Sequence, residues 1–140
     1  ACHNNDLTQC SVEEIGNAYD NAILYTDYFL GQAIELLKAN DADFETTLIY
    51  LSDHGESLGE NGIFLHGLPR VLAPDNQFHV PAVLWFGPGN PDVDVEALAA
   101  KRNLRFTHDN LFHTVLGLLE VETSVYRKEL DILDGARRPE

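Results

Sequence analysis

The sequence predicts an α/β fold in which helices flank a mostly parallel central sheet. A long helical segment with one apolar face comes first, two short apolar runs follow it, and a second helical segment comes last. Neither apolar run alternates with polar residues, which is typical of strands covered on both faces, as in parallel sheets. The 140 residues, 44% of them hydrophobic, are enough for one domain or a large piece of one.

The first helix is expected to extend from the residue after Ser11 to about Ala39. Ser11 and Glu14 match the capping-box pattern, and Asn40 and Asp41 favour an end to the helix after them. Apolar and small residues recur at steps of three and four, which indicates one buried face. These positions are Ile15, Ala18, Tyr19, Ala22, Thr26, Phe29, Ala33 and Leu37.

Two strands are expected, at residues 46–51 and 80–86. The first is a continuous run of β-branched and apolar residues, and Pro81 lies near the start of the second, where a missing N–H is tolerated. A glycine-rich loop at 52–67 separates them. Ligands of open α/β sheets bind outside the carboxyl ends of strands, so this loop is the first place to look for a site.

The last helical segment follows a strong turn signal at residues 87–91. Thr107 is expected to cap a short amphipathic helix that continues to Leu119. Because no repeat, low-complexity segment or linker interrupts the chain, residues 1–140 are predicted to form part of one domain.

The charge of the chain excludes several function classes. With 9 basic and 23 acidic residues, the formal net charge is -14. Nucleic acid is therefore not expected as a partner, because few side chains could neutralise a row of phosphates. The acidity also argues against unaided docking on an anionic membrane surface. No apolar run approaches the ~20 residues that cross a bilayer.

Cys2 and Cys10 are the two cysteines, and mostly polar residues separate them. This spacing favours a local disulfide ahead of the first helix, which would place the protein in an oxidising compartment. Two reduced thiols, or a metal site that includes His3, are the alternatives.

The loop after the first strand carries the side chains with the clearest chemistry. Asp53 and His54 come where the strand ends, Gly55 is expected to free the backbone to turn, and His66 lies twelve residues beyond His54. Oxygen and imidazole ligands suit Zn²⁺ or Mn²⁺ better than Mg²⁺. Two ligands are half a site, so others must complete it. Alternatively, Asp53 accepts backbone hydrogen bonds in an ordinary loop turn.

A serine hydrolase is a rival interpretation of the same loop. Residues 55–59 match the G-x-S-x-G nucleophile elbow around Ser57, and Asp94 or Asp109 followed by His113 supplies the chain order of a triad. The elbow serine should lie directly after the strand, however, and Ser57 lies beyond Asp53 and His54. We expect His113 to be satisfied by a neighbour instead.

Four motifs stand along the chain, at residues 17–27 (NAYDNAILYTD), 52–62 (SDHGESLGENG), 65–67 (LHG) and 80–82 (VPA). With them the sequence resembles the bacterial lipid A phosphoethanolamine transferases, which include the mobile colistin-resistance enzymes that cause polymyxin resistance. This family belongs to the alkaline phosphatase and sulfatase superfamily. The resemblance covers nearly the whole chain, with the separate motifs in the family's order.

The resemblance implies a role for particular residues. Asp53 and His54 match two of the four ligands of the catalytic zinc. His66 matches a histidine that binds the phosphoethanolamine group or a second zinc, and Glu56 lies on that substrate side. Cys2 and Cys10 match a disulfide formed in the periplasm.

The resemblance also implies what the 140 residues leave out. In the family, a threonine nucleophile takes phosphoethanolamine from phosphatidylethanolamine and yields it to a phosphate of lipid A. That threonine, a glutamate zinc ligand, another substrate histidine and the membrane anchor match no position here. The chain is therefore expected to be the C-terminal portion of a catalytic domain at the periplasmic face of the inner membrane, and inactive alone. A sulfatase or phosphotransferase with another acceptor is the alternative.

Overall fold

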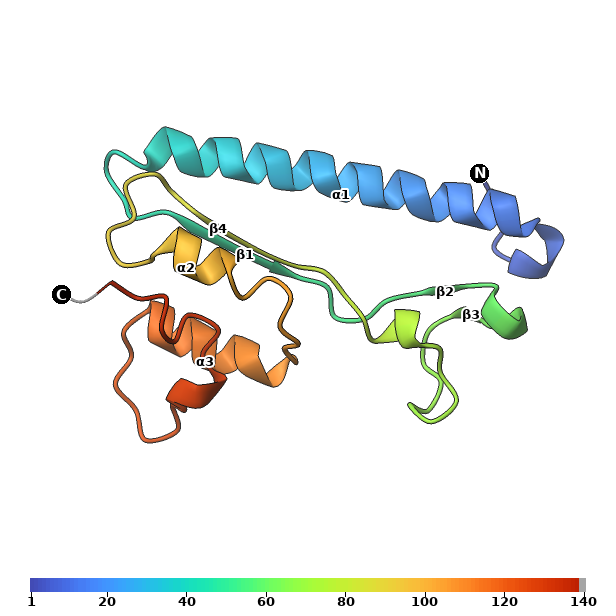
Figure 1. Cartoon of the computed structure of the whole chain (residues 1–140). Helices are drawn as coiled ribbons and strands as arrows, with labels where there is room; N and C mark the ends of the chain where they lie inside the picture. Colours follow the sequence, from blue (N-terminus) through green and yellow to red (C-terminus); the bar gives the residue numbers. More distant parts are fainter. Residues whose placement is uncertain (139–140) are drawn as a thin grey trace. The chain divides into compact units, whose positions relative to one another are not determined.

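A long helix, α1 (Val12–Asn40), dominates the first part of the computed structural model, which describes residues 1–138 (Figure 1). The capping box is confirmed, because the Ser11 side chain accepts a hydrogen bond from the Glu14 N–H and the Glu14 carboxylate accepts one from the Ser11 N–H. The predicted apolar face is only partly covered: Ile15 is buried, whereas Phe29 is 61% exposed.

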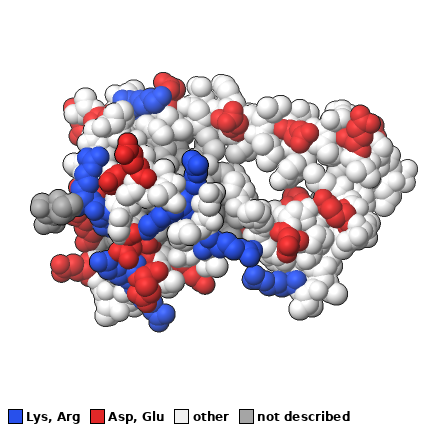
Figure 2. All heavy atoms as spheres, in the orientation of Figure 1, with Lys and Arg blue, Asp and Glu red and all other residues white. Residues whose placement is uncertain are grey.

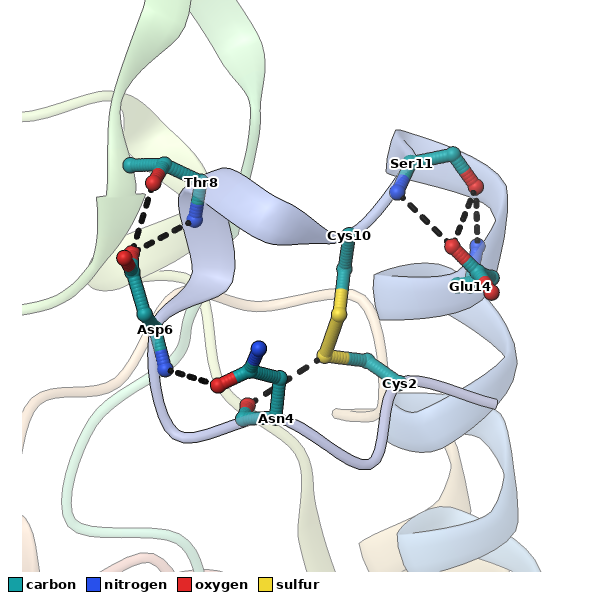
Figure 3. Close-up of a disulfide and its surroundings, with 7 residues drawn as sticks. All are labelled: Cys2, Asn4, Asp6, Thr8, Cys10, Ser11 and Glu14. Carbon is teal, nitrogen blue, oxygen red and sulfur yellow. Dashed lines mark hydrogen bonds between the residues drawn. A yellow bond between two sulfur atoms is a disulfide. The ribbon is translucent and has the colours of Figure 1, made fainter.

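The disulfide between Cys2 and Cys10 is confirmed (Figure 3). It closes a loop that contains a short 3-10 helix, η1 (Leu7–Gln9), capped by the Asp6 side chain. The Cys2 N–H also donates to the Glu14 carbonyl, so the loop is fixed to the first turns of α1.

Two small sheets follow, each of two strands. β1 (Thr47–Leu51) pairs with β4 (Ala82–Phe86), and each strand lies within a range that the sequence predicts. β2 (Ser57–Leu58) and β3 (Phe64–Leu65) form an antiparallel hairpin inside the glycine-rich loop. The hairpin turns through a 3-10 helix, η2 (Glu60–Gly62).

The α/β class is confirmed, but the strand pairs of the described part do not run parallel. The Ser52 N–H donates to the Pro81 carbonyl at 3.4 Å, which places the end of β1 beside the start of β4. These two strands therefore run in opposite directions (Figure 1). All five residues of β1 are half-buried, rather than fully covered on both faces.

The chain divides into two compact units, Ala1–Trp85 and the part from Phe86 onward. The second unit contains α2 (Val95–Ala99), α3 (Asp109–Leu118) and η4 (Lys128–Leu130). The helix α2, whose N-cap is Asp94, was not predicted from the sequence. The cap of α3 was predicted one residue too early, at Thr107. His108 is the N-cap residue, whereas Thr107 donates its N–H to the Asn110 side chain.

The second unit has its own core, in which Val93, Leu133 and Ala136 are buried. Asp131 is also buried there, whereas on the face that Figure 2 shows, acidic groups are scattered among basic and uncharged ones. Among the described residues, no helix combines the length and apolar character that crossing a bilayer requires.

Candidate metal centre

The candidate site lies where β1 ends and the chain enters the β2–β3 hairpin. Asp53 and His54 follow the end of β1 after one intervening residue, Ser52. The hairpin pairs Ser57 with Leu65, so the residues that flank this pair, Glu56 and His66, lie side by side. The hairpin thus brings His66 next to His54, although the two residues are twelve positions apart in the sequence.

Three side chains gather into one group that could hold a metal ion. One ligand atom from each of His54, Glu56 and His66 lies within 4.8 Å of the others. His66 Nδ1 is 2.8 Å from Glu56 Oε1, and His54 Nδ1 is 4.0 Å from the same oxygen. The two imidazole rings stack with centroids 3.6 Å apart.

The hydrogen bonds of both histidines favour one tautomer. His54 Nδ1 lies 3.2 Å from the Gly55 carbonyl, and His66 Nδ1 faces the Glu56 carboxylate. Both partners are acceptors, so each Nδ1 carries a proton and donates it. Each Nε2 is then left with a lone pair, which is how protein metal sites orient histidine ligands.

Asp53 lies on the Nε2 side of His54. Its Oδ2 is 3.7 Å from His54 Nε2, close to the ~3.3 Å that separates two ligand atoms on one tetrahedral zinc ion with bonds of ~2.0–2.1 Å. The Asp53 side chain is 88% exposed, and its Oδ1 accepts the His54 N–H. The backbone hydrogen bond expected of an ordinary turn is therefore present, and the other carboxylate oxygen remains open to a ligand.

Glu56 supplies an independent sign that the group fits a cation. Its Oε1 faces His66, whereas its Oε2 is buried and has no hydrogen-bond partner among the described residues. A buried carboxylate oxygen without a partner is costly, since it has lost its water and gained nothing in exchange. A metal ion or a cationic substrate group at this position would remove the cost.

The structure does not place Ser57 on a nucleophile elbow. Ser57 lies in β2, is 1% exposed, and its Oγ accepts a hydrogen bond from Gln77 Nε2 at 2.8 Å. His113 is buried, and its Nδ1 accepts the Arg127 N–H, so it is satisfied by a neighbour as expected. The carboxylate of Asp94 caps α2 through two backbone N–H groups.

The segment that contains η3 (Asp75–Gln77) contacts the loop of the site, and no feature of the sequence predicted this contact. Asn76 Nδ2 donates to Glu60 Oε1, and the Gln77 carbonyl accepts the Gly55 N–H. Hydrogen bonds from backbone N–H groups, with the Asn76 amide, lower the pKa of Glu60. A short polar run between two strands carries no periodic or motif signal that would have revealed these contacts.

The fold and the site together define an α/β domain in which histidine and carboxylate side chains after the first strand could hold a metal ion. The sulfatase family model matches residues 2–121. The chain therefore belongs to the sulfatase family.

Curated relatives narrow the comparison to transferases. The chain is 48% identical over 141 residues to phosphoethanolamine transferase EptA of Salmonella typhimurium, a match that covers 98% of the chain and 26% of the relative. It is 42% identical over 120 residues to phosphatidylethanolamine transferase Mcr-2 of Escherichia coli, covering 86% of the chain and 21% of that protein. The chain thus spans about a quarter of the length of these relatives.

A solved structure supports the fold directly. The chain matches the integral membrane protein lipooligosaccharide phosphoethanolamine transferase A (EptA) of Neisseria meningitidis with a TM-score of 0.94 and 42% identity. The match covers 99% of the chain and 27% of that protein. The resemblance to phosphoethanolamine transferases and the sulfatase-like fold class are therefore confirmed.

Proposed function

We propose that these 140 residues are the C-terminal portion of the catalytic domain of a phosphoethanolamine transferase. The reaction moves phosphoethanolamine from phosphatidylethanolamine to a phosphate of lipid A. The single observation that carries the proposal is the His54–Glu56–His66 group beside Asp53, in a chain that is 48% identical to a named phosphoethanolamine transferase.

The proposed ion is zinc, held by Asp53 and His54 with ligands outside this chain. His54 offers its Nε2 toward the Asp53 carboxylate, because its Nδ1 faces the Gly55 carbonyl. When bound, zinc stabilises the negative charge that builds on phosphoryl oxygens during transfer. The nucleophile is a threonine of the longer protein, outside these residues.

His66 and Glu56 bind the transferred group beside the proposed zinc site. The Glu56 carboxylate fixes the ring of His66 by accepting from Nδ1, so His66 Nε2 is free to meet a phosphoryl oxygen. The second oxygen of Glu56 suits the ammonium of ethanolamine or a second metal ion, since it is buried without a partner.

The site of action follows from the donor, the acceptor and the disulfide. We place the domain at the periplasmic face of the inner membrane, tethered by an anchor outside this chain. The Cys2–Cys10 disulfide supports an oxidising compartment. The matched Neisseria protein is an integral membrane protein, which supports the tether. The isolated chain is expected to be inactive, because the nucleophile lies elsewhere.

The experiment is a transfer assay on the longer protein, with lipid A products measured by mass spectrometry. Asp53→Ala should reduce transfer by roughly a hundredfold or more. Asp20→Ala, which removes another exposed carboxylate of the same unit, should transfer at the wild-type rate. Wild-type transfer by Asp53→Ala would refute the proposed role of this site.

His66 gives a second, more discriminating variant. His66→Ala should raise KM for the phosphatidylethanolamine donor more than it lowers the zinc content, because the ring lies on the substrate side. Equal loss of zinc and of substrate binding would instead make His66 a ligand of the catalytic ion.

A further inference from the structure

We propose that Gln77 is a positioning residue that holds the loop carrying His54 and Glu56 in its working shape, an inference that rests on the proposed function. No sequence motif points to Gln77, and it does not touch the metal-competent group. Its contacts on both sides of Glu56 carry the proposal.

Gln77 holds the chain immediately before and immediately after Glu56. Its backbone carbonyl accepts the Gly55 N–H at 3.0 Å, and its side-chain Nε2 donates to Ser57 Oγ at 2.8 Å. Gln77 is 2% exposed and Ser57 is 1% exposed, so water cannot replace either partner. The two anchored residues flank Glu56, which is thereby held at a fixed position and direction.

Gly55 allows this close approach. The sequence suggested that Gly55 frees the backbone to turn, but Gly55 is not among the glycines with positive φ. Its role is steric, because a Cβ at this position would overlap the backbone carbonyl of Asn76. The segment before β4 therefore lies directly against the loop, and a backbone atom cannot rotate away as a side chain can.

Two further hydrogen bonds extend the contact to both ends of the loop. Ser52 donates its N–H to the Pro81 carbonyl, and Asn76 Nδ2 donates to Glu60 Oε1 at 2.8 Å. Residues 52–60 are thus tied to residues 76–81 along their whole length. Supporting contacts of this kind decide whether a site is held within a fraction of an ångström of its working geometry.

Ser57 therefore accepts a buried hydrogen bond from Gln77 that holds the loop, and it has no nucleophilic role. This also accounts for a serine in the middle of a metal-binding loop. A hydroxyl at this position satisfies the buried amide of Gln77, whereas alanine would leave that amide without a partner.

Three variants of the longer protein separate positioning from stability. Ser57→Ala and Gln77→Met each leave one polar group of the pair without its partner, whereas the double variant Ser57→Ala/Gln77→Met removes both groups. Removing both partners of a buried hydrogen bond is nearly neutral for stability, while removing one is not. The thermal midpoint of the double variant should therefore return most of the way to the wild-type value.

The zinc affinity should not return with it. We expect all three variants to bind zinc about tenfold more weakly in chelator competition, as the loss of one supporting hydrogen bond typically produces. Recovery of wild-type zinc affinity in the double variant would overturn the proposal, since Gln77 would then contribute stability alone. Unchanged affinity in the single variants would overturn it as well.

Thr114→Val is the matched control. Thr114 is also 1% exposed, and its hydroxyl donates to the Asn110 carbonyl and accepts the Ile132 N–H in the second unit. The control should lower the thermal midpoint without weakening zinc binding. Equal weakening of zinc binding by the control would show that any loss of stability has this effect, and would overturn the proposal.

Hydrogen exchange measures how firmly the Gln77–Ser57 hydrogen bond holds the loop, and it needs neither metal nor substrate. The peptide that spans residues 53–58 should exchange about tenfold faster in Ser57→Ala and Gln77→Met, with α1 unchanged. Protection equal to wild type would refute the positioning role of Gln77, even in a protein that binds zinc. Faster exchange in a protein that binds no zinc would support the positioning role and count against the proposed function.

Discussion

Two polar clusters of the molecule each contain a carboxylate with a buried oxygen, and they differ in how completely its hydrogen bonds are satisfied. In the second unit, the Asp131 side chain is fully buried and accepts hydrogen bonds from Tyr126, Leu133 and Arg137 at 2.8–2.9 Å. In the first unit, the group around Glu56 is half-exposed and keeps a buried oxygen without a partner.

This difference separates a structural cluster from the proposed metal centre. Asp131 has a donor for each of its oxygens, so the network stabilises the fold and has no unmet need for a ligand. One oxygen of Glu56 meets His66 Nδ1, whereas the other is buried without a donor. A buried carboxylate therefore does not by itself mark a ligand site; an unmet hydrogen bond is the distinguishing feature.

The largest effect on stability is expected from Asp131→Ala. The substitution leaves the Arg137 guanidinium, which is 29% exposed, without its carboxylate and strands two further donors. Breaking a buried ion pair in this way costs about 3–5 kcal/mol. Chemical denaturation would measure the loss, and zinc content should not change. A loss below about 1 kcal/mol would contradict the structural role.

Two glycines, one beside each cluster, have no room for a Cβ. Gly117→Ala would press against the side chains of Asp131 and Arg137, and Gly55→Ala against the carbonyl of Asn76. Overpacking costs typically about 1–3 kcal/mol in either place. Thermal unfolding should show both losses, but only Gly55→Ala should weaken zinc binding. A Gly117→Ala variant that also loses zinc would remove the distinction between the clusters.

Alkaline pH should weaken the structural cluster. Burial, together with the hydrogen bond to Asp131, raises the pKa of Tyr126 from 10.0 to about 12. The folded state therefore holds this proton more tightly than the unfolded state. The associated stability is complete below pH 10 and is lost as the pH rises toward about 12.

Tyr126→Phe provides the matching control for this pH dependence. Unfolding free energies measured between pH 9 and about 12 should fall more steeply for the wild type than for the variant. Parallel curves for the two proteins would contradict a protonated Tyr126 in the Asp131 network. Absorbance of tyrosinate at high pH gives an independent reading of the same proton.

The smallest effect is expected from the exposed capping box of α1. Ser11→Ala removes an acceptor for the Glu14 N–H, and a lost N-cap costs typically about 1 kcal/mol. Circular dichroism during thermal unfolding would measure it. An effect as large as that of Asp131→Ala would show that exposure does not govern these contributions.

The parts predicted best from sequence are those with local signals. The capping box at Ser11, the two apolar strands and the Cys2–Cys10 pair each depend on neighbouring residues, and the structure confirms them. Asp53, His54 and His66 were candidate ligands because of their place in the loop, but their spacing suggested only half of a metal site. The resemblance to a family supplied their expected roles and added Glu56.

The parts missed depend on contacts between distant residues or on very short elements. The β2–β3 hairpin has two residues in each strand, which is too short for a pattern of alternating apolar and polar residues. It turns through Asn61 and Gly62, which have positive φ. The contact of Gln77 with Ser57 joins residues twenty positions apart. The expected cover on both faces of β1 requires neighbours that the described residues do not provide.

The zinc content of the longer protein tests the proposed metal centre without depending on the transfer reaction. It would be determined per molecule of the longer protein after dialysis, for the wild type, Asp53→Ala and the Asp20→Ala control. We expect the wild type and the control to bind zinc and Asp53→Ala to lose it. Zinc retained at the wild-type level by Asp53→Ala, or absent from all three proteins, would contradict a metal centre at the end of β1.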